Sequence, residues 1–196
     1  QLGSGCSCDP QQVGMSHKGR PCPSFLDVAK AHGKRAGVIS DTRLTHATPA
    51  SFSVHVEHRG SEAEIAEKML SSRLDILMSG GLSYFVPKEG AASLPPDCTQ
   101  LNAASARKDS RNLVKEFQDR GYQVVCSSDS LTASTTTPLL GLFAPSEMKD
   151  AFEEGGNSEP SLEQMLRRSF ELFDNPAGFA LMVEAGQIDW AGHDIN

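Results

Sequence analysis

Short apolar runs that alternate with helical segments most restrict the fold of this 196-residue chain. Each run is only a few residues long, and turn residues separate it from the next segment with helical periodicity. The runs that predict strands span residues 36–40, 75–78, 123–126, 139–143 and 179–183. The segments that predict helices span residues 24–32, 49–58, 61–72, 110–120, 146–153 and 161–173. This alternation predicts an α/β fold with a parallel, doubly wound sheet.

The composition indicates an acidic globular domain with a sizeable core. Hydrophobic residues make up 38% of the chain, and the formal net charge is −7. An acidic balance argues against a nucleic-acid surface or an anionic-membrane surface, because both need clustered Lys and Arg. No apolar run approaches the roughly 18 to 20 residues that span a bilayer, and residues 1–10 do not resemble a signal peptide.

We expect one domain over residues 1–196, without an internal boundary. Residues 84–109 are rich in Pro, Gly, Ala and Ser, so we expect a surface loop or insertion with little core there. The chain has five cysteines and no CxxC pair, which argues against a zinc knuckle and against a redox motif. One or two disulfides are possible in an oxidising compartment.

Three metal-ligating side chains follow the last predicted strand, in the stretch VEAGQIDWAGHD. Glu184 comes at the carboxyl end of that strand, on the sheet edge where ligands of open α/β proteins bind. Asp189 and His193 are four residues apart, so on a helix they would share one face and could bind one zinc ion. Glu184 would point elsewhere, toward a magnesium ion. From spacing alone, a solvated helix face is the more common outcome.

A second polar cluster follows the strand predicted at residues 36–40. His46 and Thr48 come shortly after it, so both should lie on the same sheet edge as Glu184. Thr48 precedes Pro49 and fits the N-cap position of the helix at 49–58. From residue type and position alone, a helix cap and a loop histidine are the favoured interpretations.

Both clusters resemble motifs of the alkaline phosphatases. In that family a buried strand ends in Val-Glu-Gly or Val-Glu-Ala, followed by Ile-Asp and a His four residues later. THATPASFSVHVEHR resembles the stretch in which Asp or His, then Thr or Ser, then Pro-Ala precede the arginine that grips the phosphate. Position by position, this implies His46, Thr48 and Arg59. Further collinear segments resemble the family from about residue 23 onward: SFLDVAKAHGKRAGVIS, DILMSGGLSYF, LLGLFAPSEM and PSLEQMLRRSFELF.

The resemblance implies two Zn²⁺ ions and one Mg²⁺ ion in the complete enzyme. Asp189 and His193 would bind the zinc that activates water, and Thr48 and Glu184 would bind the magnesium. His46 would belong to the magnesium shell, directly or through water. Arg59 would clamp two phosphate oxygens with its planar guanidinium. The pairing of His46 with Trp190 resembles some bacterial members, where others carry Asp and Lys.

The implied fold is the three-layer α/β sheet of the alkaline-phosphatase type, incomplete because we expect a central fragment. The family's nucleophilic serine lies upstream of the matching segment, in an Asp-Ser-Ala stretch, and its remaining zinc ligands lie downstream. The fragment alone should therefore be inactive. Asp129-Ser130 is interpreted as surface, and the resemblance assigns no ligand role to His55 or His58.

The resemblance implies a phosphomonoesterase that acts on small phosphate monoesters through a phosphoserine, in the periplasm or outside the cell. The complete protein is expected to be a homodimer. One alternative is a non-catalytic or degenerate metal-binding domain of the same fold. Another is a different member of the superfamily, such as a phosphodiesterase or a phosphoglycerate mutase.

Overall fold

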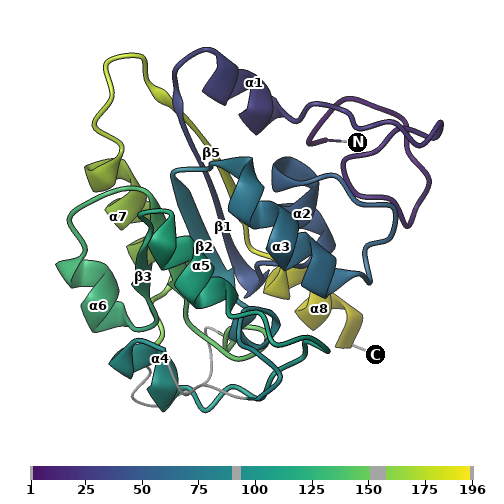
Figure 1. Cartoon of the computed structure of the whole chain (residues 1–196). Coiled ribbons are helices and arrows are strands. Elements are labelled where there is room, and N and C mark those ends of the chain that lie inside the picture. The colour runs from purple at the N-terminus through teal and green to yellow at the C-terminus, as the bar shows by residue number, and fades with distance from the viewer. Residues whose placement is uncertain (1, 90–93, 151–157, 195–196) are drawn as a thin grey trace.

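A computed structural model describes residues 2–89, 94–150 and 158–194, and its centre is a parallel five-stranded sheet with the order β3-β4-β2-β1-β5 (Figure 1). The strands are β1 (Arg35–Arg43), β2 (Ile76–Gly80), β3 (Gln123–Val125), β4 (Leu139–Leu142) and β5 (Phe179–Glu184). The helices are α1 (Phe25–Ala31), α2 (Ala47–Ser53), α3 (Glu62–Ser72), η1 (Leu82–Tyr84), α4 (Pro96–Gln100), α5 (Leu113–Asp119), α6 (Ser128–Ala133), α7 (Leu162–Leu172) and α8 (Gln187–Asp194). All five predicted strands are present, and every neighbouring pair is parallel.

The strand order reverses at β1. From β1 the sheet extends through β2 and β4 to β3 on one side, and β5 pairs with β1 on the other side. The register places Ser40 opposite Glu184, so the carboxyl ends of β1 and β5 meet. In Figure 1 these two strands run downward side by side, and α8 begins below the end of β5. Open α/β sheets bind ligands at such a reversal.

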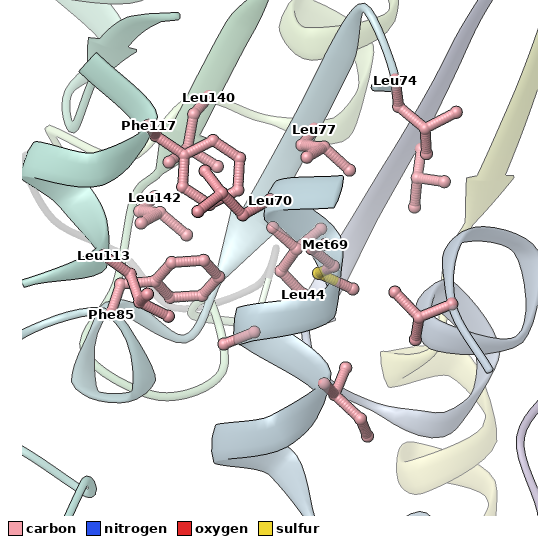
Figure 2. Close-up of a cluster of buried hydrophobic side chains, with 14 of the residues drawn as sticks. Leu44, Met69, Leu70, Leu74, Leu77, Phe85, Leu113, Phe117, Leu140 and Leu142 are labelled. Atoms are coloured by element: carbon pink, nitrogen blue, oxygen red, sulfur yellow. The ribbon is translucent and has the colours of Figure 1, made fainter. Parts of the chain in front are cut away.

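Helices cover both faces of the sheet. Alternate strand residues point to opposite faces, so Val38 and Leu77 join one core while Ile39 and Met78 join the other. The first core, shown in Figure 2, packs against α1, α2, α3 and α5. The second core packs against α6 and α7. The predicted doubly wound, three-layer arrangement is confirmed. None of the helices in these ranges has the length and apolar character needed to cross a bilayer.

The helix predicted over residues 49–58 is shorter than expected. α2 ends at Ser53, and Val54 takes an extended conformation. Val54 and Val56 are both buried, and Val56 forms an antiparallel bridge with Val13. β-branched residues favour this extended, paired state. Pairing with the N-terminal segment therefore overrides the helical pattern.

Other local predictions also differ from the structure. Residues 127–138 were expected to be a connection, but Ser127 and Ser130 form a capping box that starts α6. Residues 146–150 are not helical, and 151–153 lie outside the described residues. Phe179 and Val183 are 43% and 41% exposed, because β5 is an edge strand of the described sheet and not a buried one.

The stretch at 84–109 was expected to contribute little to the core, and this is wrong at several positions. Phe85, Val86 and Cys98 are fully buried in the first core. The 3-10 helix η1 reaches into the start of this stretch, and α4 lies within it. The composition of the stretch is dominated by small residues, so it did not predict that a few of its apolar side chains belong to the core. That the stretch is an insertion remains a prediction.

Two disulfides connect Cys6 with Cys22 and Cys98 with Cys126, and Cys8 is a free cysteine. The second bond joins α4 to the end of β3 across a separation of 28 residues. Such a crosslink lowers the entropy of the unfolded chain.

Removing that bond is expected to destabilise the protein. Changing both Cys98 and Cys126 to Ala should lower the free energy of unfolding by about 3 kcal/mol, because the unfolded chain regains the closed loop's entropy. Urea unfolding under non-reducing conditions measures the change. The matched control is Cys8→Ala, which removes a cysteine without removing a crosslink. Equal stability of the double variant and the control would mean that the bond contributes nothing.

Candidate active site

The Glu184 carboxylate is held at the end of β5 by two hydroxyl groups from β1. Ser40 Oγ donates to Glu184 Oε2 at 2.6 Å, and Thr42 Oγ1 lies 3.3 Å from the same oxygen. The two hydroxyls are 2.8 Å apart. Both Ser40 and Thr42 are buried, so the carboxylate has a defined orientation at the sheet edge.

The turn after Glu184 requires glycine. A Cβ atom on Gly186 would lie 2.4 Å from Thr42 Cγ2, which is closer than real Cβ contacts allow. It would also lie 3.3 Å from the carboxyl carbon of Glu184. The chain can therefore turn from β5 into α8 only because residue 186 has no side chain.

His46, and not Thr48 as predicted, occupies the N-cap position of α2. Its Nε2 lies 3.3 Å from Arg59 Nη2, and its ring meets the Trp190 ring edge-on with 5.8 Å between centroids. Burial lowers the pKa of His46, the nearby Arg59 lowers it further, and Glu184 opposes the shift. The imidazole is thus biased toward its neutral form, in which Nε2 can accept a hydrogen bond.

His46 Nδ1 is buried and has no hydrogen-bond partner among residues 2–89, 94–150 and 158–194. Buried polar atoms in proteins are nearly always paired, so an unpaired one indicates an unseen water, ion or ligand. This observation fits a histidine that faces the water shell of a metal ion.

Thr48 and Arg59 line one cavity of about 210 Å³, together with residues of the N-terminal segment. The Arg59 side chain is exposed, while its backbone N–H donates to the carbonyl of Gln11 at 2.7 Å. The segment after α2 therefore brings the guanidinium back to His46 at the start of that helix. Of the three residues that the sequence predicted here, Thr48 and Arg59 line the cavity, and His46 contacts Arg59.

Asp189 and His193 share one face of α8, as their spacing predicted. His193 Nε2 lies 3.7 Å from Asp189 Oδ2, and the two side chains are 79% and 75% exposed. No residue of α8 is buried. The helix approaches the rest of the site through Trp190, which contacts His46. The pair is thus open to solvent, on a helix that touches the site through Trp190.

The donor types fit the expected metals, but the ligand sets are incomplete. No group of three or more His, Cys, Asp or Glu side chains suitable for one metal occurs in the described part of the chain. Carboxylate and hydroxyl oxygens, as in Glu184 and Thr48, suit magnesium, and the carboxylate and imidazole of Asp189 and His193 suit zinc.

A charged network supports the loop that carries His46. Arg43 donates to both carboxylate oxygens of Glu62 at 2.9 and 3.1 Å, and Thr45 Oγ1 donates to Glu62 at 2.6 Å. Arg43 also pairs with Glu147. Burial alone would raise the pKa of Glu62, but the bonds from Arg43 and Thr45 outweigh it and lower the pKa. Because His46 N–H donates to the Arg43 carbonyl, this network fixes the approach to α2.

His55, His58 and Ser130, for which the sequence predicts no role in the site, have other partners. His55 Nδ1 lies 2.7 Å from the carbonyl oxygen of Gly14, whereas His58 Nδ1 accepts the Gly60 N–H at 3.0 Å, so they do not form a helical pair. Ser130 belongs to the capping box of α6, which follows β3 at the far edge of the sheet.

Sequence reasoning missed Ser40, Asp41 and Thr42. Their signal was available, because polar residues at the end of a predicted strand fall on the functional edge of a parallel sheet. What the sequence could not show was their contact with the chain around Glu184, which lies 144 residues from Ser40.

Comparisons with known proteins point to one family. A family model described as alkaline phosphatase matches residues 3–196. The repressible alkaline phosphatase of Saccharomyces cerevisiae is 36% identical over 92% of this chain and 34% of its own length. Alkaline phosphatase 4 of Bacillus subtilis is 33% identical over 98% of this chain and 39% of its own length. The chain thus spans little more than a third of these relatives.

Solved structures show the same relationship. The crystal structure of Thermus thermophilus alkaline phosphatase matches 98% of this chain and 38% of its own, at 32% identity and a TM-score of 0.83. A mutant alkaline phosphatase from the Antarctic bacterium TAB5, solved with magnesium bound, matches 98% of this chain and 50% of its own at 25% identity and a TM-score of 0.77. With its parallel sheet, its paired strand ends and a family match over nearly its whole length, the chain belongs to the alkaline phosphatase family.

Proposed function

We propose that this chain is the central part of a metal-dependent phosphomonoesterase that works through a phosphoserine intermediate. The observation that carries the proposal is the grouping of Glu184, His46 and Arg59 at the reversal point of the sheet. A fixed carboxylate, an unpaired buried imidazole nitrogen and a guanidinium are the groups that a magnesium shell and a phosphate ester need. Family membership supports this assignment.

Glu184 and Thr48 would hold magnesium, with His46 in its shell directly or through water. The similar TAB5 alkaline phosphatase mutant was solved with magnesium bound. Asp189 and His193 would hold one zinc ion. Zinc in a catalytic site takes three protein ligands and leaves one position open, so at least one further ligand would come from outside the described residues. When bound, the metals would polarise the phosphate and lower the pKa of water.

The chain's own residues would bind and orient the phosphate. Arg59 can donate two parallel N–H bonds to non-bridging phosphate oxygens. A neutral His46 Nε2 can accept from Arg59 without neutralising it, and Arg59 forms no salt bridge within residues 2–89, 94–150 and 158–194, so the guanidinium remains available for an anion. The attacking serine would come from outside residues 1–196. We further propose small phosphate monoesters as substrates, a homodimer, and a periplasmic or extracellular location.

Hydrolysis assays on the full-length gene product test this function. Purified protein should hydrolyse p-nitrophenyl phosphate, lose activity after EDTA treatment, and regain it with Zn²⁺ and Mg²⁺ together. Metal binding without turnover would favour the non-catalytic alternative. Faster hydrolysis of bis-p-nitrophenyl phosphate than of the monoester would favour a phosphodiesterase.

Arg59→Lys separates phosphate binding from folding. The variant should bind inorganic phosphate about tenfold more weakly, because Lys keeps the charge but loses the bidentate contact. Its thermal midpoint should not change, since the Arg59 side chain is exposed. Competitive inhibition by phosphate measures the affinity, and Arg73→Lys, an exposed arginine beyond the other end of the sheet, is the control. An unchanged inhibition constant would remove Arg59 from the site.

A further inference from the structure

Asp41 connects the end of β1 to the turn between the two proposed metal sites. Its Oδ1 accepts the Gly186 N–H at 2.7 Å. Gly186 lies two residues after Glu184 and three before Asp189. Ser40 and Thr42, the neighbours of Asp41, direct their hydroxyls to Glu184, so this short piece of β1 holds both the carboxylate and the turn that follows it.

The backbone carbonyl of Asp41 also binds the chain that follows Glu184. Its carbonyl accepts from Gln187 Nε2 at 3.0 Å and from the Met148 N–H at 3.2 Å. Gln187 Nε2 also donates to the Met148 carbonyl at 2.6 Å. Three segments that are distant in the sequence therefore meet at Asp41, and Gln187, the first residue of α8, is part of the junction.

This junction sets the direction in which α8 leaves the sheet. Gly186 faces β1 closely, because a Cβ atom on it would lie 2.4 Å from Thr42 Cγ2. The bond from its N–H to Asp41 prevents it from moving away. The Gly186 carbonyl then accepts the Asp189 N–H at 3.2 Å, in the first turn of α8. Both backbone polar groups of Gly186 are therefore hydrogen-bonded: its N–H to Asp41, and its carbonyl to the Asp189 N–H.

The surroundings of Asp41 combine partial burial with a nearby acidic side chain. Asp41 is half-buried, and the charge of Glu184 acts on it. Its Oδ1 nevertheless accepts the Gly186 N–H at 2.7 Å, and this is the contact that ties the turn to β1.

We propose that Asp41 is a positioning residue that sets the separation and direction between Glu184 and Asp189 by holding Gly186. This inference rests on the proposed function, because it takes those two acids as metal ligands. Residues that orient metal ligands through hydrogen bonds commonly change metal affinity 10- to 100-fold when they are lost. Asp41 never touches the metal or the phosphate in this scheme.

Titration calorimetry with Mg²⁺ on the full-length gene product tests the proposal. Asp41→Ala should bind Mg²⁺ about 10- to 100-fold more weakly than the unchanged protein. Asp41→Asn, whose Oδ1 can still accept the Gly186 N–H, should stay within about threefold. Asp119→Ala, which removes an exposed acid from α5, should not change the affinity. If Asp41→Ala does not fold, Asp41→Ser replaces it, since its hydroxyl is too short to reach Gly186.

Unchanged Mg²⁺ affinity in Asp41→Ala, or equal losses in Asp41→Ala and Asp41→Asn, would overturn the positioning role. Amide exchange at Gly186 gives a second readout: the N–H should be protected in Asp41→Asn and exposed in Asp41→Ala. Glu184→Gln distinguishes a failure of the metal assignment from a failure of the role of Asp41. If Glu184→Gln leaves Mg²⁺ affinity unchanged, the metal assignment itself fails. If it abolishes binding while Asp41→Ala does not weaken it, only the role of Asp41 fails.

Discussion

Replacing Asp189 by Asn in the full-length gene product is expected to lower kcat/KM for a phosphate monoester about 100- to 1,000-fold. A catalytic zinc supplies several kcal/mol of transition-state stabilisation, and each 1.4 kcal/mol is a tenfold change in rate. Asn keeps the shape of Asp but is a neutral and weaker ligand. The side chain is 75% exposed, so the folded structure should be unaffected.

Zinc content and thermal midpoint distinguish this effect from misfolding. Asp189→Asn should lose zinc at an unchanged midpoint, as measured by elemental analysis and by thermal unfolding. Asp194→Asn, an exposed acid on the same helix, is the matched control and should keep its zinc. If both variants behave alike, or if Asp189→Asn retains full zinc and full activity, α8 presents an ordinary solvated face.

The largest expected loss of stability comes from Phe117→Ala, at about 3–5 kcal/mol. Phe117 is fully buried on α5, with ring centroids 6.0 Å from Phe85 and 4.8 Å from Tyr122 (Figure 2 shows the core around it). Its removal leaves a cavity between α5 and the sheet that the rigid strands cannot fill.

Urea unfolding measures this loss, and Phe170→Ala is the matched control. Phe170 is 52% exposed on α7, so its removal should cost far less. A similar cost for the two variants would mean that the core in Figure 2 is not the main source of stability.

The sheet could be predicted from the sequence because buried parallel strands are nearly continuous apolar runs. The helix α1 was equally accessible, since Ser24 and Asp27 form a reciprocal capping box at its start. The start of α6 was missed because Ser130 stands where a capping box usually has Glu or Gln. The end of α2 was missed because it depends on the bridge between Val56 and Val13, which local patterns do not contain.

The sequence could predict which residues lie at the site, but not the contacts and the solvent exposure of their side chains. Glu184 follows an apolar run, so its place at the sheet edge follows from the strand alone. The hydroxyls of Ser40 and Thr42 reach it only because β5 pairs with β1, and that pairing places Ser40 opposite a residue 144 positions later in the chain. Likewise, the spacing of Asp189 and His193 predicted their shared face but could not show how open to solvent that face is.

Anomalous diffraction at the zinc edge, on crystals of the full-length gene product grown with Zn²⁺, Mg²⁺ and inorganic phosphate, tests the central claim most directly. The account predicts a zinc peak about 2.0–2.2 Å from an Asp189 oxygen and a His193 nitrogen. Phosphate should lie against the guanidinium of Arg59. A zinc peak bound only by other residues, with Asp189 and His193 in solvent, would contradict the account.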